Sequence, residues 1–232
     1  MKCGIMQPYI FPYIGFFQLV NLVDTFVLYD DVNYINKGWI NRNNILINGK
    51  ASLFTIPLKG ASQNKKINEI EIDNSTGWQN KLVKSIRMSY ARAPYFEEVD
   101  NLLQQILSNE HILIADLNFY ALKEICSYLN LKTSIVRTSA IFDNDQLKGQ
   151  NRIIDICKQV GADHYINPIG GQEIYSGDLF HENLIKLNFI RTKSLQYRQN
   201  NVQFIPNLSI IDTLMFNKKS EITELLTQYD LL

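Results

Sequence analysis

The sequence lacks the features that mark several large classes of proteins. It has three cysteines in 232 residues and no Cys-x-x-Cys spacing, so neither a disulfide framework nor a zinc site of known type is expected. Lysine plus arginine equals aspartate plus glutamate, at 23 each, which leaves no net charge to attract nucleic acid or an anionic membrane. Apolar runs end well short of the ~20 residues that cross a bilayer. We therefore expect no membrane span and no DNA partner.

The N-terminal segment lacks the apolar core and cleavage site of a secretory signal, because Gln7 and Pro8 interrupt it early. This favours a cytoplasmic location. Cys126 and Cys157 fall on apolar helix faces, and we interpret them as packed thiols rather than catalytic ones. The three histidines show no metal-ligand spacing, so no metal is expected and no cofactor is required.

The remaining pattern predicts a single α/β domain over residues 1–232. Hydrophobic residues make up 46% of the chain, which is enough for a packed core. Apolar runs predict a mostly parallel sheet in which Ile5, Val27, Ile135 and Ile166 lie on neighbouring strands. The expected elements, in chain order, are a βαβ unit over 2–29, a hairpin around Asn48-Gly49, a strand over 67–72, a helical middle section over 75–130, a strand over 131–138, a helix over 145–160, strands over 164–166 and 187–191, and two helices over 210–232.

The loop that follows the first strand is the first candidate site. Gln7 to Phe16 contains two prolines and Gly15, at the strand end where open α/β sheets bind ligands. The prolines stiffen the loop, and Gly15 would let a ligand approach the start of the helix. The alternative is a rigid connector that only orients the helix.

The second candidate begins at Asp30 and Asp31, where the second strand ends. A carboxylate there could act as a general base. Side chains alternate along a strand, so the two are not expected to form a dyad. Stacking and anion-binding groups follow in the same loop: Lys37, Trp39, Asn41 and Arg42. The alternative role is helix capping and surface ion pairing.

The third candidate combines Arg152, at a helix start, with the loop after the strand over 164–166. Gly170 and Gly171 could offer two backbone N–H groups to an anion or a carbonyl oxygen, with Asn167 and Tyr175 beside them. A plain turn is the alternative for such a glycine pair.

With these segments in view, the sequence resembles the WbqC-like family over nearly its whole length. This bacterial group is often found in gene clusters for O-antigen and other surface polysaccharides. Four motifs carry the resemblance: Met6-Gln7-Pro8-Tyr9 with Pro12 and Gly15; Tyr29-Asp30-Asp31-Val32 with Trp39-Ile40-Asn41-Arg42; Leu147-Lys148-Gly149-Gln150 with Arg152-Ile153; and Tyr165 to Gly171 with Tyr175. The resemblance implies a transferase, some members being associated with placing glycyl or other aminoacyl groups on amino sugars.

A fainter resemblance links the loop over 11–16 to the HxGH loop of nucleotidyltransferases, which implies a Rossmann-like sheet. Tyr13 and Phe16 occupy the positions of the two histidines that contact phosphate in that motif. The sequence therefore favours the fold of these enzymes more than their adenylyl-transfer chemistry.

The leading hypothesis is transfer of an acyl or aminoacyl group to the amine of a nucleotide- or lipid-linked amino sugar in the biosynthesis of surface polysaccharides. Asp30 or Asp31 would be the base; Lys37, Arg42 and the glycine amides would bind phosphate or oxyanion; Tyr9 and Trp39 would supply flat apolar surface. The activated donor is a carrier-protein thioester, a coenzyme A thioester or an aminoacyl-tRNA. Two alternatives are a degenerate nucleotidyltransferase and a non-catalytic subunit that binds sugar nucleotides.

Overall fold

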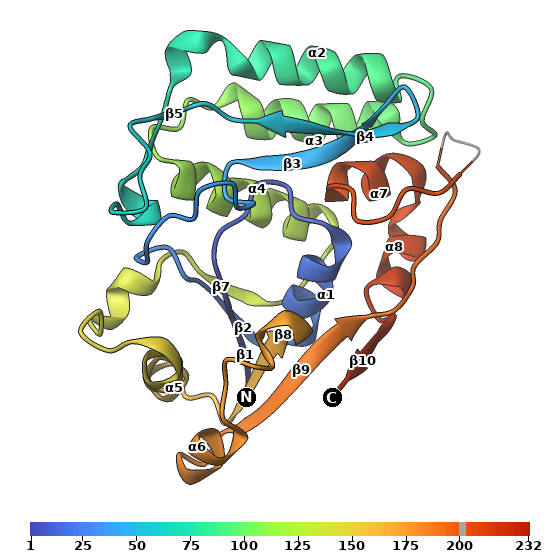
Figure 1. The fold of residues 1–232 in the computed structure, drawn as a ribbon. Coiled ribbons are helices and arrows are strands. Elements are labelled where there is room, and N and C mark those ends of the chain that lie inside the picture. The colour runs from blue at the N-terminus through green and yellow to red at the C-terminus, as the bar shows by residue number, and fades with distance from the viewer. Residues whose placement is uncertain (200–202) are drawn as a thin grey trace.

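The computed structural model describes residues 1–199 and 203–232, which include a central six-stranded sheet (Figure 1). Each neighbouring pair is parallel except the last, in which β10 runs antiparallel to β9 at one edge. The predicted α/β class and mostly parallel sheet are thus confirmed. The strands, in order across the sheet, are β10 (Tyr229–Leu231), β9 (Lys186–Thr192), β8 (His164–Pro168), β1 (Lys2–Met6), β2 (Thr25–Leu28) and β7 (Ser134–Val136).

The central strands are buried on both faces, which is why they read as short continuous apolar runs. All four residues of β2 are buried, and Val27 lies opposite Ile5 of β1. Ile5 and Val27 face one core, which contains α5 (Gly149–Gln159) and α6 (Gly177–Glu182). Phe26 faces the larger core on the other side, with α1 (Ile14–Leu22).

The helical middle section is confirmed as three helices, α2 (Trp78–Tyr90), α3 (Phe96–Ser108) and α4 (Ile114–Tyr128). They pack beside the sheet as part of the larger core. The predicted start of α2 differs in detail. Asp73 caps a short 3-10 turn, η2 (Asn74–Thr76), and α2 begins only after Gly77, which has the left-handed φ of 63°.

The predicted hairpin is confirmed as β3 (Arg42–Ile47) and β4 (Lys50–Thr55). Its turn residues, Asn48 and Gly49, both have positive φ, as the two-residue turns that match strand twist require. The prediction of a strand over 67–72 is wrong for its first half. That half forms a 3-10 turn, η1 (Ile67–Glu69). The Glu69 carboxylate accepts from the backbone N–H of Lys66 and so favours the turn. Only β6 (Glu71–Ile72) is extended, paired with β5 (Leu58–Lys59).

Two helices near the C-terminus, α7 (Ile210–Phe216) and α8 (Lys219–Leu225), are confirmed, but the residues after them are not helical as predicted. They form β10, which pairs with β9 through the backbone and through an ion pair between Arg191 and Asp230 at 3.0 Å. A three-residue edge strand is too short to show the alternation of apolar and polar residues by which a strand is recognised in a sequence. The strand over 131–138 and the helix over 145–160 are also shorter than predicted. In the described part of the chain, no helix is long and apolar enough to cross a membrane.

Candidate functional site

The order of strands reverses at β1, so the C-terminal ends of β1, β2 and β8 meet at one edge of the sheet. Open α/β sheets bind ligands outside this edge, at the point where the order reverses. Gln7 follows β1 directly, and its half-buried amide has no hydrogen-bond partner among the described residues. The three sequence-predicted segments all begin at this edge.

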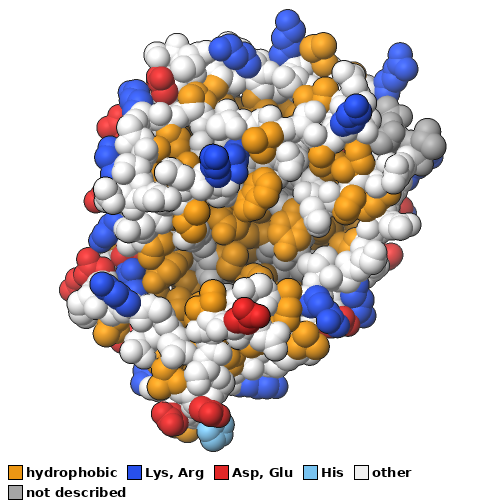
Figure 2. Space-filling view, in the orientation of Figure 1, with side chains coloured by type: hydrophobic (Ala, Val, Ile, Leu, Met, Phe, Trp, Pro, Cys, Tyr) orange, Lys and Arg blue, Asp and Glu red, His pale blue; other side chains and the backbone are white. Residues whose placement is uncertain are grey.

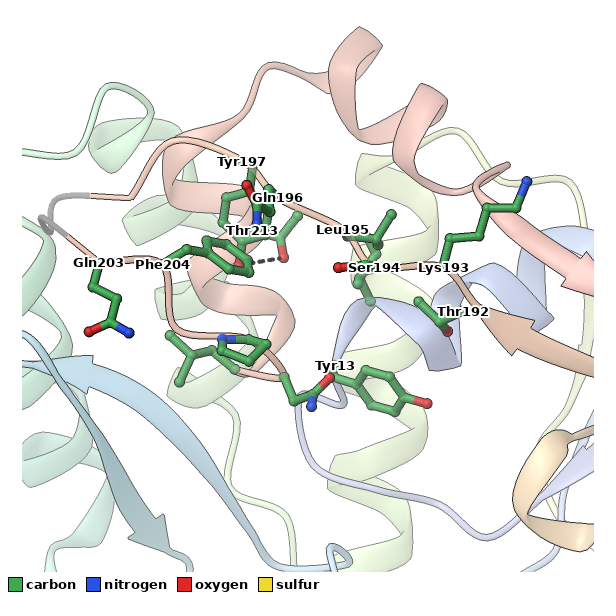
Figure 3. A pocket seen from close by; sticks show the side chains of 14 residues that line it. Tyr13, Thr192, Lys193, Ser194, Leu195, Gln196, Tyr197, Gln203, Phe204 and Thr213 are labelled. Atoms are coloured by element: carbon green, nitrogen blue, oxygen red, sulfur yellow. Dashed lines mark hydrogen bonds between the residues drawn. The ribbon is translucent and has the colours of Figure 1, made fainter.

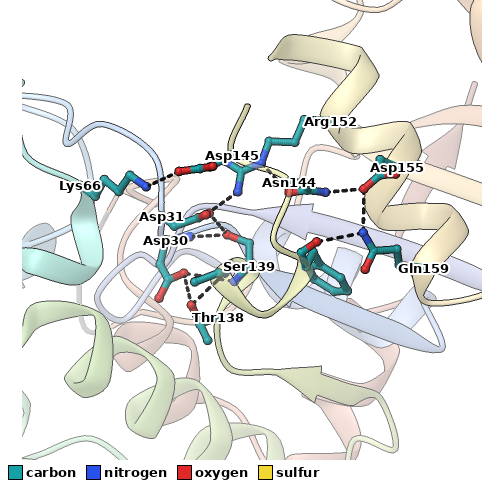
Figure 4. Close-up of polar contacts among 12 residues, drawn as sticks. Asp30, Asp31, Lys66, Thr138, Ser139, Asn144, Asp145, Arg152, Asp155 and Gln159 are labelled. Carbon is teal, nitrogen blue, oxygen red and sulfur yellow. Dashed lines mark hydrogen bonds and ion pairs between the residues drawn. The ribbon is translucent and has the colours of Figure 1, made fainter. Parts of the chain in front are cut away.

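Asp31 and Arg152 form a buried ion pair there, in which the two side chains are only 5% and 4% exposed (Figure 4). The hydroxyl of Ser139, in η3 (Ser139–Phe142), also donates to Asp31. The Arg152 Nε donates to Asn144 at 2.9 Å, and the guanidinium lies 5.0 Å from the centre of the Tyr29 ring. Both oxygens of the Asp31 carboxylate, and the Nε and Nη2 of Arg152, are therefore hydrogen-bonded within the protein.

Asp30 is equally buried but has different partners. Its Oδ1 accepts from the Thr138 hydroxyl at 2.6 Å and from the Ser139 N–H at 3.1 Å. Burial raises the pKa of Asp30 above its ordinary value, and these two hydrogen bonds oppose the rise. The two carboxylates lie in the loop after β2; both bind Ser139, but Asp30 also binds Thr138 whereas Asp31 binds Arg152. We call Asp30, Asp31, Thr138, Ser139 and Arg152 the carboxylate network.

A second group of residues surrounds an open pocket of about 260 Å³. Trp39 is 44% exposed and Tyr13 38%, which is high for aromatic side chains in a folded protein. Figure 2 shows apolar side chains gathered at a hollow in the middle of this face. We call this site the aromatic pocket, and its lining consists of Tyr9, Pro12, Tyr13, Trp39, Asn43 and Asn207.

Buried amides hold the two loops that form the aromatic pocket. The Asn118 amide of α4 donates to the backbone oxygens of Pro8, at 3.0 Å, and Ile40, at 2.8 Å. The backbone N–H of Ile10 donates to the oxygen of Trp39 at 3.3 Å. The backbone of the two loops that carry Tyr9 and Trp39 is thus held by α4 and by a bond between the loops. Sequence reasoning missed Asn118, although a lone amide on the apolar face of a helix was a signal that could have identified it.

The hairpin also holds the loop after β1, because the Asn43 amide donates to the backbone oxygens of Ile10 and Phe11, at 3.1 and 2.8 Å.

Tyr13 packs against Gly15, at the start of α1. A Cβ at Gly15 would lie 2.3 Å from the Tyr13 ring and 2.6 Å from the Thr192 hydroxyl. The chain's own atoms therefore fill the space that Gly15 leaves, and the expectation that a ligand uses that space is wrong.

Three predicted binding residues shape the loop around Trp39. The Arg42 guanidinium donates to the backbone oxygens of Lys37 and Gly38, and it lies 5.9 Å from the centre of the Trp39 ring. Lys37 is exposed and has a left-handed φ of 60°. Asn41 is buried and donates to a backbone oxygen at 2.8 Å. Arg42 and Asn41 therefore position the loop, while Lys37 faces solvent.

The loop after β8 is also tightly packed. Asn167 accepts from the Tyr165 hydroxyl at 3.0 Å, and a Cβ at Gly171 would lie 1.9 Å from the Asn167 amide nitrogen. Gly171 thus makes room for Asn167, whereas Gly170 is exposed with open space around it. Tyr175 packs edge-on against Tyr165 at 5.7 Å.

The structure sorts the predicted residues into three groups at one edge of the sheet. The carboxylate network contains Asp30, Asp31 and Arg152; the aromatic pocket and its loop contain Tyr9, Lys37, Trp39, Asn41 and Arg42; and the loop after β8 contains Asn167, Gly170, Gly171 and Tyr175. The sequence also predicts that one cleft is surrounded by members of all three groups together with Gln7, namely Gln7, Asp30, Asp31, Trp39, Arg42, Arg152, Gly170 and Tyr175; this stays a prediction. Within residues 1–199 and 203–232, no three His, Cys, Asp or Glu side chains are placed to hold a metal ion.

Fold and site together define an α/β protein with a mostly parallel sheet and an aromatic pocket beside the loop that follows its central strand. The chain belongs to the WbqC-like protein family, whose sequence model matches residues 7–224. It is 30% identical over 224 residues to an uncharacterized protein of Mycobacterium tuberculosis, Rv1507c, and the match covers 95% of each chain. No solved structure matches the chain.

Proposed function

We propose that this protein transfers an acyl or aminoacyl group, such as glycyl, from an activated donor to the amine of a nucleotide- or lipid-linked amino sugar. The observation that carries the proposal is the aromatic pocket, which offers exposed rings at the loop after the central strand. Flat apolar rings with a few amides around them suit a sugar or base ring. The reaction class is proposed from the resemblance to the WbqC-like family, which implies a transferase.

The proposed reaction needs a base but no protein nucleophile. The amine nitrogen attacks the acyl carbonyl carbon, the carbon–sulfur or carbon–oxygen bond to the donor breaks, and the amine proton passes to a carboxylate. We assign that role to Asp30, because its raised pKa brings it closer to a working pH, while Asp31 is paired with Arg152. Direct transfer is favoured because Cys3, Cys126 and Cys157 are all buried.

The test is an assay of purified protein with glycyl coenzyme A, a glycyl carrier protein or glycyl-tRNA and a panel of UDP- and dTDP-linked amino sugars, followed by mass spectrometry. Asp30→Asn should lower turnover by roughly 10²-fold or more, since general bases contribute about that much. The variant should still fold, because the Thr138 hydroxyl and the Ser139 N–H can both donate to an amide oxygen. Full activity in Asp30→Asn would contradict the assignment.

Donor alone should leave all three cysteines unmodified. An acyl adduct on a cysteine that disappears when the amine is added would overturn direct transfer and indicate a two-step mechanism through the thiol.

Nucleotidyl transfer is the second candidate, and the strand order favours it. Counted by chain position, β7, β2, β1, β8, β9 and β10 follow the order 3-2-1-4-5-6, which is that of sheets that bind nucleotides. Stabilisation of the protein by ATP with magnesium, and not by sugar nucleotides, would favour this candidate. Binding of sugar nucleotides without turnover of any donor would favour a non-catalytic subunit.

A further inference from the structure

A second, larger cavity adjoins the aromatic pocket. Its volume is about 760 Å³, within the range of ~300–1,000 Å³ typical of small-molecule sites. It lies between the start of α1, the end of β9 and the segment before α7 (Figure 3). Tyr13 and Asn207 line both cavities, so the two spaces adjoin at these side chains. We call the larger space the polar cavity.

The polar cavity differs in chemistry from the aromatic pocket. Its lining includes hydroxyl and amide side chains such as Ser194 and Gln196, and no aspartate or glutamate is among the described residues that line either cavity. Among the described residues, the side chains of Ser194, Gln196 and Asn207 have no hydrogen-bond partner. Unpaired neutral donors and acceptors around a roomy space match a polyhydroxylated ligand, whose hydroxyl groups both donate and accept.

The wall between the two cavities is held in place. The Tyr13 ring and the hydroxyl of Thr192, the last residue of β9, both pack over Gly15. Figure 3 shows the Tyr13 ring turned toward Thr192. A ligand that occupies both cavities must therefore pass the edge of a fixed ring, next to the free amide of Asn207.

We infer that the two cavities form one composite site for a nucleotide-linked sugar. The base stacks on Trp39 and Tyr9 in the aromatic pocket, the sugar binds in the polar cavity, and the diphosphate passes Tyr13 and Asn207. Because no carboxylate is found in the described part of either lining, the diphosphate meets no like charge there. This inference rests on the proposed function for the class of acceptor only, because it selects the nucleotide-linked acceptor over the lipid-linked one. It concerns binding of the sugar nucleotide and assigns no base, since Asp30 is not among the described residues that line either cavity.

The experiment measures binding of three probes by calorimetry: UDP-N-acetylglucosamine, UDP and free glucosamine. Trp39→Ala should weaken UDP and the UDP-sugar alike by about tenfold, as expected for loss of one base–aromatic stack. Ser194→Ala and Gln196→Ala should weaken the UDP-sugar about fivefold and leave UDP unchanged, since one neutral hydrogen bond contributes about that much. Met88→Ala, on the exposed face of α2, is the control and should change neither.

Several outcomes would overturn the inference: no binding of any UDP probe, equal effects of Ser194→Ala on UDP and on the UDP-sugar, or loss of glucosamine binding alone in Trp39→Ala. Acyl transfer to a lipid-linked amino sugar, with no binding of UDP-sugars, would refute the composite site and leave the proposed function intact. The expected binding pattern without transfer from any donor would support the site and refute the function.

Discussion

The carboxylate network and the aromatic pocket lie at the same edge of the sheet, but their side chains differ in exposure and in pairing. Asp31 and Arg152 are 5% and 4% exposed and bind one another, whereas Trp39 is 44% exposed. Groups whose hydrogen bonds are satisfied inside the protein fix the geometry around them, and groups left open are available to a ligand. We therefore expect Arg152 to position the groups around it and Trp39 to contact the ligand.

Breaking the ion pair should have the largest effect on folding. Arg152→Met leaves the Asp31 carboxylate buried without its partner, so we expect a loss of about 3–5 kcal/mol in the free energy of unfolding. Urea unfolding measures this. Arg191→Ala, which removes an exposed ion pair with Asp230, is the matched control and should cost about 0–1 kcal/mol. Equal losses in the two variants would contradict the structural role of the network.

The double variant Arg152→Met with Asp31→Leu sharpens this result. It removes both charges, so it should recover part of the stability that Arg152→Met loses. No recovery would mean that the Asp31 charge is not the source of the loss.

Asn118→Ala should have a smaller effect on folding, about 1–3 kcal/mol, because it leaves two buried carbonyl oxygens without a donor. It should also weaken binding of UDP-N-acetylglucosamine, since Asn118 holds both loops of the aromatic pocket. Asn109→Ala removes an exposed amide that donates to a single backbone oxygen and should change neither quantity. Unchanged binding in Asn118→Ala would show that the pocket forms without this anchor.

A third buried carboxylate, Asp212 of α7, gives a prediction about pH. It accepts from the hydroxyls of Tyr90 and Tyr197, at 3.0 and 2.7 Å, and burial raises its pKa. With a raised folded-state pKa, stability is present at low pH and falls as pH rises through that pKa.

Removing the Tyr90 hydroxyl takes a donor from the ionised form of Asp212 and raises its pKa further. Tyr90→Phe should therefore cost about 1–2 kcal/mol. The cost should be larger near about pH 8 than near about pH 5, because a larger fraction of the Asp212 carboxylate is ionised at the higher pH. Denaturant unfolding at the two pH values measures the loss in the free energy of unfolding. An equal loss at both would contradict the claim that the Tyr90 hydroxyl stabilises the ionised form of Asp212.

Elements with a strong local pattern were predictable, and those fixed by distant partners were not. Val27 lies in an apolar run that only a buried strand explains, and Asn48-Gly49 needs a hairpin turn. β10 depends on backbone pairing with β9, and η1 depends on Glu69 reaching back to Lys66. Neither contact produces a periodic pattern of apolar residues that could be read from the sequence.

The candidate site was predictable only as residue types near strand ends. Asp31 and Arg152 were named separately, and their pairing across 121 positions required the fold. Ser194 and Gln196 carry no motif, because they become notable only when Tyr13 lies beside them.

The central claim is that a ligand meets Trp39 in the aromatic pocket, and tryptophan fluorescence tests it most directly. The chain has two tryptophans, and Trp78 is buried in α2 at 7% exposure. In Trp78→Phe, where Trp39 is the remaining fluorophore, titration with UDP-N-acetylglucosamine should quench emission to saturation. In Trp39→Phe, emission from Trp78 should stay constant. Saturable binding by calorimetry with no change in Trp39 emission would contradict the account.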